Sequence, residues 1–151
     1  MEKNIEKNTF CSAMAGVKKL QYIDVKNVKS LMPHLDGWRL LLKEGHYLSR
    51  VSFHETKVHT LPDGNAYTHT VEAAIPAKGG VAARDLMRME QGRYLVIVTD
   101  NNSKLWLLGD TEEPLRASVS DSNEGTAGEF TGYRLTFSGT TQWPQMQVVT
   151  G

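Results

Sequence analysis

The chain has 151 residues and a mass of 16.8 kDa, with 17 basic residues, 17 acidic residues and a hydrophobic share of 40%. This size and composition indicate one globular domain. The zero formal net charge gives no overall field that would gather nucleic acid or an anionic membrane, but it leaves a local charged patch open. The single cysteine excludes an internal disulfide framework, and no apolar run approaches the roughly 20 residues of a membrane-spanning helix.

The first third of the chain begins with a polar segment and then predicts short strands. Residues 1–16 carry charges of both signs and are expected to form an N-terminal extension, followed by a single β-rich domain over residues 17–151. Residues 17–25 predict a first strand, and residues 38–42 predict a short buried strand. The stretch between them, residues 29–37, contains a proline and a glycine and is typical of a turn-rich connection.

A long hairpin is predicted from residues 46–60 and 66–75, because Asp63-Gly64 between them favours a turn. The outer half is polar on both faces, so residues 54–70 are expected to project as an arm that buries little within its own domain. Such an arm is either solvated or lies against another chain, where edge pairing and polar contacts hold it. In the second case the candidate subunit interface lies along both strands: Lys57, His59, Leu61, Asp63, Asn65, Tyr67 and His69.

Residues 81–91 predict one helix. Ala82, Leu86 and Met89 recur at helical spacing, and Gly92 is placed to end the helix. Because only Gly92 separates this helix from the next strand, its apolar stripe is expected to pack on one face of that strand.

Residues 93–110 predict a hairpin that is apolar on both faces. With Asn101-Asn102 as a two-residue turn, Val98 faces Leu105, and Ile97 lies on the opposite face. An antiparallel sheet in a small protein usually exposes one face to water. Both faces of this hairpin therefore need a cover, supplied either by the helix and a second sheet of the same chain or in part by a neighbouring subunit.

Residues 115–121 and 132–139 predict two further strands, since apolar residues alternate along each of them. The sum is about eight strands with one helix. The sequence thus predicts a mainly β protein, either a β-sandwich or a partly open barrel.

No constellation of side chains indicates catalysis, a cofactor or a metal. His54 and His59 resemble part of a metalloprotease motif, but their odd spacing on a strand sends them to opposite faces. The lysine and glycines of residues 77–80 lack the full phosphate-loop pattern. A hydrolase built on His54, Glu55 and His59 is therefore the weakest functional hypothesis.

Residues 98–144, VTDNNSKLWLLGDTEEPLRASVSDSNEGTAGEFTGYRLTFSGTTQWP, resemble the C-terminal part of small virion proteins encoded by phages and prophages of Bacteroides-type bacteria. The shared order is a hairpin that ends in LLGDTEEPLR, a glycine-rich loop, and then GYRLTFSGTTQWP. The succession of a helix, a hairpin and further strands is also similar to the tail-tube fold, in which a β-sandwich with a flanking helix assembles into stacked hexameric rings. The resemblance implies a tail-tube-like protein of the virion, whose partners are identical subunits and other virion proteins.

The expected function is therefore that of a phage-type virion structural protein, in the tail tube or an adjoining tail component, which acts by self-assembly into rings and not as an enzyme. No membrane partner and no cofactor is expected, and nucleic acid is not expected as a specific ligand. The alternative is a monomeric β-sandwich module that binds a small molecule or carbohydrate on a face carrying aromatic residues such as Tyr67 and Trp143.

Overall fold

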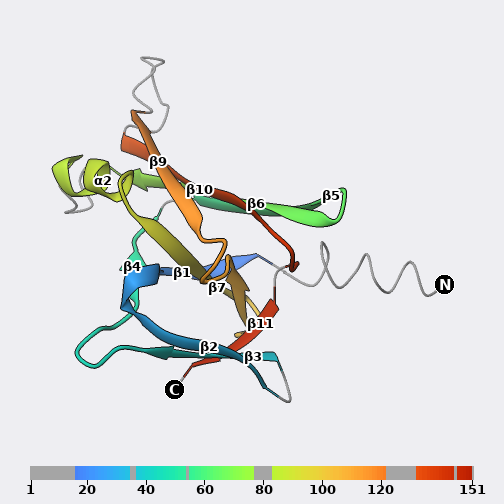
Figure 1. Cartoon of the computed structure of the whole chain (residues 1–151). Coiled ribbons are helices and arrows are strands. Elements are labelled where there is room, and N and C mark those ends of the chain that lie inside the picture. The colour runs from blue at the N-terminus through green and yellow to red at the C-terminus, as the bar shows by residue number, and fades with distance from the viewer. Residues whose placement is uncertain are drawn as a thin grey trace.

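The computed structural model describes residues 16–34, 37–53, 55–76, 83–121, 132–144 and 146–150, so the predicted extension over residues 1–16 lies outside the described part apart from Gly16. The described residues confirm a mainly β fold with one α-helix, in an open mixed sheet that fits a β-sandwich or partly open barrel (Figure 1). In chain order the elements are β1 (Val17–Asp24), the 3-10 helix η2 (Val25–Asn27), β2 (Val28–His34), β3 (Gly37–Leu42), β4 (Ser49–Val51), β5 (Glu55–Asp63), β6 (Ala66–Pro76), α2 (Ala83–Met89), β7 (Arg93–Asp100), β8 (Leu105–Leu108), β9 (Leu115–Asp121), β10 (Gly132–Thr141) and β11 (Met146–Thr150). No helix in this part of the chain has the length and apolar character needed to cross a membrane.

The strands are arranged in an upper, a middle and a lower layer (Figure 1). The upper layer has the order β9-β10-β6-β5, the middle layer holds β4, β1, β7 and β8, and the lower layer holds β2 and β3. β7 links upper and middle layers, because it pairs with β8 and also, at its first residues, with β9. β11, which the sequence did not predict, links middle and lower layers by pairing antiparallel with β8 and parallel with β3.

Both faces of β7 are buried inside a single chain. Val96 and Val98 pack with Leu108 in the core between the upper and middle layers, to which α2 also contributes. Leu95 and Ile97 pack in a second core formed with side chains of β2, β3 and β11. All four β7 side chains have 0% exposure, and full burial of an aliphatic side chain stabilises a fold by about 1.5–3 kcal/mol. The lower layer, and not a neighbouring subunit, covers the second face.

Helix α2 confirms the predicted helix over the residues that the structure describes. Leu86 and Met89 are buried in the upper core, as their spacing predicted, whereas Ala82 lies outside the described residues. The helix ends in tight backbone turns, such as Gly92 N–H to the Met89 carbonyl at 3.1 Å. Gly92 is not a positive-φ cap; a Cβ at this position would overlap the hydroxyl of Tyr94, so packing requires the glycine.

The predicted register between β7 and β8 is wrong by one residue. Val98 pairs with Trp106, and Ile97 pairs with Leu107. The loop between the strands has three residues, 101–103, and Ser103 adopts a φ of 65°, as in hairpins that combine a turn with one left-handed residue. Because a shift of one residue exchanges the faces of a strand, the upper core receives Leu108 instead of Leu107.

The buried carboxylate of Asp100 explains this register. Its Oδ1 accepts hydrogen bonds from the backbone N–H groups of Asn102 (2.8 Å) and Lys104 (3.0 Å), and its Oδ2 accepts one from the indole Nε1–H of Trp106 (2.9 Å). Burial alone raises the pKa of Asp100, but these hydrogen bonds and the charge of Lys104 outweigh burial and hold the pKa below its ordinary value. A two-residue turn would move Trp106 to the opposite face and remove its bond.

Most of residues 29–37 form strand β2 instead of the predicted turn-rich connection. β2 is the last strand at one end of the sheet, and a proline such as Pro33 is tolerated there because an end strand has one side without a partner. Gly37 begins β3 at a φ of 146°, and a Cβ on it would overlap the backbone carbonyl of Gln147 in β11. The close approach of these two strands therefore requires glycine.

The long hairpin forms from β5 and β6, but the prediction of a projecting arm is wrong. Asp63 pairs with Ala66, so the turn is Gly64-Asn65, with Gly64 at a φ of 65°. β10 continues to Thr141 and pairs with β6 along nearly its whole length, which makes β6 an interior strand. The hairpin is thus the outer part of the upper layer, and β5 is the edge of the sheet.

Candidate functional site

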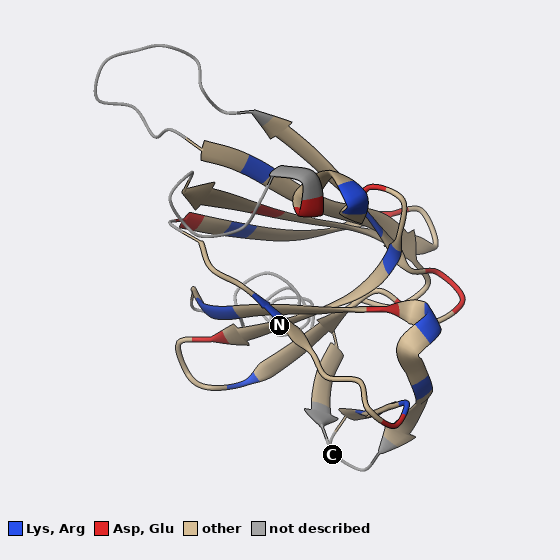
Figure 2. Cartoon of the chain, turned by 90° about the vertical axis from the view of Figure 1, so that its left-hand side faces the viewer, with Lys and Arg blue, Asp and Glu red and all other residues tan. Residues whose placement is uncertain are grey.

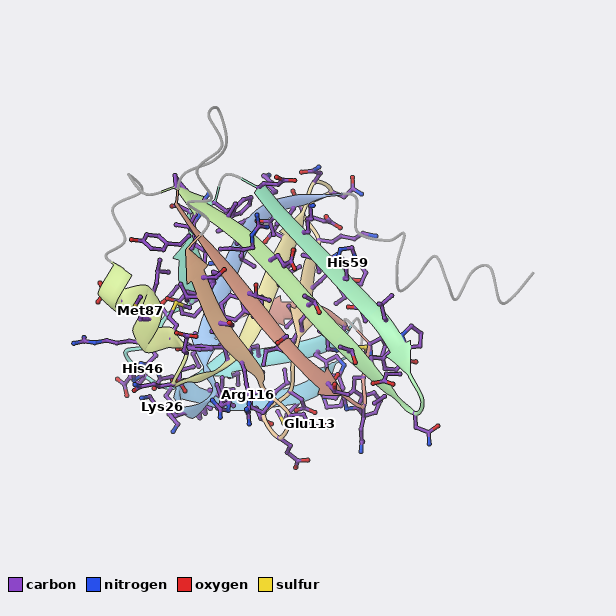
Figure 3. All side chains as sticks on the ribbon, turned by 90° about the horizontal axis from the view of Figure 1, so that it is seen from above. Lys26, His46, His59, Met87, Glu113 and Arg116 are labelled. Atoms are coloured by element: carbon purple, nitrogen blue, oxygen red, sulfur yellow. The ribbon has the colours of Figure 1, made fainter. Side chains whose placement is uncertain are left out.

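Strand β5 presents a nine-residue edge that no other strand of the described chain covers. It is the outermost strand in the view from above (Figure 3). Residues of an antiparallel strand alternate between those whose backbone groups face the partner and those whose groups face away. Since Asp63 and Ala66 flank a two-residue turn and bond to each other, the register directs the backbone N–H and C=O groups of Thr56 and Val58 outward. Such groups are a template for pairing with another chain.

The predicted interface residues differ in their exposure. On β5, Lys57 and His59 are exposed, and Leu61 has 59% of its surface exposed; His59 lies on the outer side of the layer in Figure 3. His69, by contrast, has 0% exposure and is not available to a partner. The other three residues lie at or next to the turn. Asp63 and Asn65 are exposed, and Tyr67 is half-buried.

His69 is the centre of a buried polar cluster. Its Nδ1 lies 3.0 Å from the Thr60 hydroxyl, and its Nε2 lies 2.8 Å from the Thr141 hydroxyl and 3.1 Å from the Trp143 carbonyl oxygen. A carbonyl only accepts, so the neutral ring carries its proton on Nε2 and Nδ1 accepts from Thr60. Burial lowers the pKa of His69, and the bond to Trp143 only partly opposes this effect. The cluster fastens β5 and the end of β10 to β6; without exposed surface, His69 cannot reach a substrate.

The histidines of the hairpin do not converge. His59 pairs with Thr70, and Thr60 pairs with His69, so the two imidazoles lie on opposite faces of the hairpin. His54 lies outside the described residues. Among the residues that the structure describes, no group of three His, Cys, Asp or Glu side chains is placed to hold a metal ion.

Thr56 on the same edge strand provides a test of the packing under β5. Its Oγ1 is buried and has no hydrogen-bond partner among the described residues. Thr56→Val replaces this hydroxyl by a methyl group of similar size, and the free energy of unfolding is expected to rise by about 1 kcal/mol, seen as a melting temperature higher by about 3 °C. Thr140→Val is the control, because the exposed Thr140 hydroxyl lies 3.3 Å from that of Thr68 and should give no gain. A lower melting temperature for Thr56→Val would mean that the Thr56 hydroxyl does have a hydrogen-bond partner in the folded protein.

The aromatic side chains of Trp38 and Trp143 border a cleft that is too small for a ligand. The rings of Trp38 and Trp143 pack 5.7 Å apart, with their planes at 61°. They share a cleft of about 10 Å³, which Tyr67 does not line. That volume holds about one water molecule, whereas sites for drug-sized ligands occupy about 300–1,000 Å³. The cleft therefore does not support the alternative of a module that binds small molecules through aromatic residues.

A larger groove, of about 500 Å³, lies at the start of β1 and is basic. β1 has a bulge where Val17 pairs with Asp100 and Lys19 with Thr99, which leaves Lys18 as an extra residue. A bulge re-aims side chains, and here both lysines line the groove. Among the described residues, its lining includes three cations and no acidic residue: Lys18, Lys19, Gln21, Leu48, Arg50, Thr99 and Leu105. In the sequence, only the adjacent Lys18 and Lys19 indicate this groove. The pair could not be recognised as a site without the bulge that directs both side chains into the groove.

An acidic turn follows β8, at the end of the β7–β8 pair that lies away from the groove. Asp110 and Glu113 exchange two backbone hydrogen bonds, at 3.1 and 3.2 Å, and enclose Thr111 and Glu112. The Glu113 carboxylate accepts a bond from the backbone N–H of Gln142 at 3.2 Å, which ties the turn to the end of β10. Figure 2 shows the start of β1 in blue and the β8–β9 turn in red on opposite sides of the molecule.

Comparison with known proteins adds no relative: no protein-family model, curated protein or solved structure matches the chain.

Proposed function

We propose that the chain is a phage-type virion structural protein, of the tail tube or an adjoining tail component, that assembles with identical subunits through the β5 edge. The observation that carries this proposal is the nine-residue uncovered edge, on which Leu61 is 59% exposed. The resemblance of residues 98–144 to small virion proteins supports the same function. In this proposal the chain resides in the virion, its partners are identical subunits and other virion proteins, and it is not an enzyme.

The residues of β5 favour pairing with one strand of another subunit and restrict how far that pairing extends. An uncovered edge gains backbone hydrogen bonds when another strand is added, and a closed ring leaves no edge exposed. Pro62 occupies a position whose backbone nitrogen points outward by the register, and it has no N–H to offer. Pairing should therefore stop before the turn. Lys57, the exposed third residue of β5, opposes non-specific edge-to-edge aggregation.

The test is Val58→Pro, which removes an outward N–H without breaking a bond between β5 and β6. We expect wild-type protein to form rings or larger assemblies, and Val58→Pro to stay folded but to form no rings, because edge pairing loses a donor at its centre. Val58→Ala is the matched control: it also removes the half-buried side chain but keeps the N–H, and should still assemble. Sedimentation velocity, electron microscopy and thermal melting of the three proteins provide the measurements.

Two results would count against the proposal. If wild-type protein stays monomeric over a wide concentration range, self-assembly through this edge is rejected. If Val58→Pro assembles as wild type does, subunits associate through another surface.

A further inference from the structure

We propose that the basic groove at the start of β1 receives the acidic β8–β9 turn of a second copy of the chain. This inference rests on the proposed self-assembly but not on the β5 edge, so the molecule would have two separate contacts with its neighbours. The occupant is a segment of the chain itself, which matches the groove in charge, placement and shape.

The groove and the turn carry opposite charges. In the part of the chain that the structure describes, Lys18, Lys19 and Arg50 line the groove and no acidic residue does. The facing partner would be the turn that begins at Asp110 and contains Glu112 and Glu113. Even when the nearby Arg116 is counted, residues 110–116 retain an excess of negative charge. Opposite potentials on two surfaces steer association and fix its register.

The groove and the turn are also placed so that one copy can contact the next. β7 and β8 are antiparallel, with Thr99 pairing with Leu105 at one end and Val96 with Leu108 at the other. Thr99 and Leu105 line the groove, whereas the acidic turn follows Leu108. The two surfaces therefore lie at opposite ends of the same strands, as in Figure 2. A contact between different surfaces at opposite ends leaves one of each free after every addition, so it propagates head to tail, into a ring if the rotation between copies closes and into an open chain if it does not.

The groove and the turn also match in size and shape. The groove, at about 500 Å³, has room for the side chains of one turn. The turn is held in a fixed form by the paired backbone bonds between Asp110 and Glu113, by the Thr111 hydroxyl, which donates to Asp110 at 3.3 Å, and by the bond from Gln142 to Glu113. A preorganised turn loses little conformational entropy on binding. Glu112, at the tip and exposed, is left to meet the lysines.

Charge reversal tests the contact. Lys18→Glu/Lys19→Glu makes the groove acidic, and Glu112→Lys/Glu113→Lys makes the turn basic. Each variant alone is expected to lose end-to-end association, because like charges then face each other. An equal mixture should recover it, since an acidic groove can take a basic turn and the unchanged surfaces still match. Thr111→Lys/Glu112→Lys serves as a second turn variant that keeps the bond of Glu113 to Gln142, and Lys29→Glu/Lys43→Glu reverses two exposed lysines elsewhere as the control.

The readout is zero-length carbodiimide crosslinking between isotope-labelled and unlabelled copies at low salt, mapped by mass spectrometry. Intermolecular links from Lys18 or Lys19 to Glu112 or Glu113 are expected in wild type and also in Val58→Pro, where the β5 edge is blocked. They should weaken strongly as salt rises, because the screening length falls to about 8 Å at physiological ionic strength. Persistence of the links in Val58→Pro separates this contact from the edge contact.

Three outcomes would overturn the inference. One is assembly of wild-type protein without these links, which would leave the β5 edge as the only contact. Another is crosslinking of the groove lysines to other carboxylates. The last is binding of a short single-stranded DNA that is lost in Lys18→Glu/Lys19→Glu while no intermolecular links form, which would assign the groove to nucleic-acid phosphate.

Discussion

Ile97→Asp is expected to prevent the chain from folding. Ile97 has 0% exposure and lies among apolar side chains in the core between the middle and lower layers. An unpaired buried carboxylate costs far more than a neutral polar group, and the total stability of a domain of this size is only about 5–15 kcal/mol. Expression in soluble form, far-ultraviolet circular dichroism and thermal melting measure the effect.

Two further substitutions by aspartate, one on the other face of β7 and one at an exposed site, show whether the effect of Ile97→Asp comes from burial. Val98→Asp should fail in the same way, because Val98 lies in the upper core with 0% exposure. Ser118→Asp, on an exposed position of β9, should melt within a few degrees of wild type. A folded, soluble Ile97→Asp protein would mean that the lower layer does not cover this face.

Asp100→Asn is expected to lower the free energy of unfolding by about 2–4 kcal/mol. The amide keeps the size of the side chain, but its NH₂ group would face a donor, either the backbone N–H groups of Asn102 and Lys104 or the indole N–H of Trp106. Chemical denaturation at neutral pH measures the loss. Asp110→Asn, in an exposed turn, is the control and should change stability much less.

The pH dependence of Asp100 follows from the direction of its pKa. The pKa is lower in the folded protein than its ordinary value of 3.8, so the unfolded chain binds the proton more tightly. The contribution of Asp100 is therefore fully present above about pH 4 and is lost as the pH falls from there through the folded pKa. Melting temperatures of wild type and Asp100→Asn should converge in acid. Parallel curves would show that the charge of Asp100 is not what stabilises the turn.

The alternation of apolar residues was enough to predict the long elements of the fold. Leu86 and Met89 identified the buried face of the helix, and the two-sided hydrophobicity of residues 93–98 correctly required a cover on both faces. The register at Asn101-Asn102 was missed because it depends on the Asp100 carboxylate, whose partner Trp106 lies beyond the turn. Local turn preferences do not include such a contact. β2 was missed because Pro33 breaks an interior strand but not an end strand.

The candidate site was less predictable than the fold, because it depends on which strands lie next to each other. The polar pattern of residues 54–70 identified the hairpin, yet only the pairing of β10 with β6 shows that His69 is buried and that β5 is an edge. A pattern of side chains does not tell an interior strand from an edge strand when the interior strand carries polar residues. The basic groove also depends on a bulge and on strands distant in sequence.

Strand β11 has a consequence for the order of folding. It pairs Val148 with Trp38 in a parallel ladder, so two segments 110 positions apart must meet. Contacts of such long sequence separation form slowly, because a large loop must close before any bond is gained. Until β11 pairs, the core between the β2–β3 hairpin and Ile97 is incompletely buried. Refolding kinetics should therefore contain a late phase in which the lower layer closes, and chains that stall before it would be the ones that aggregate.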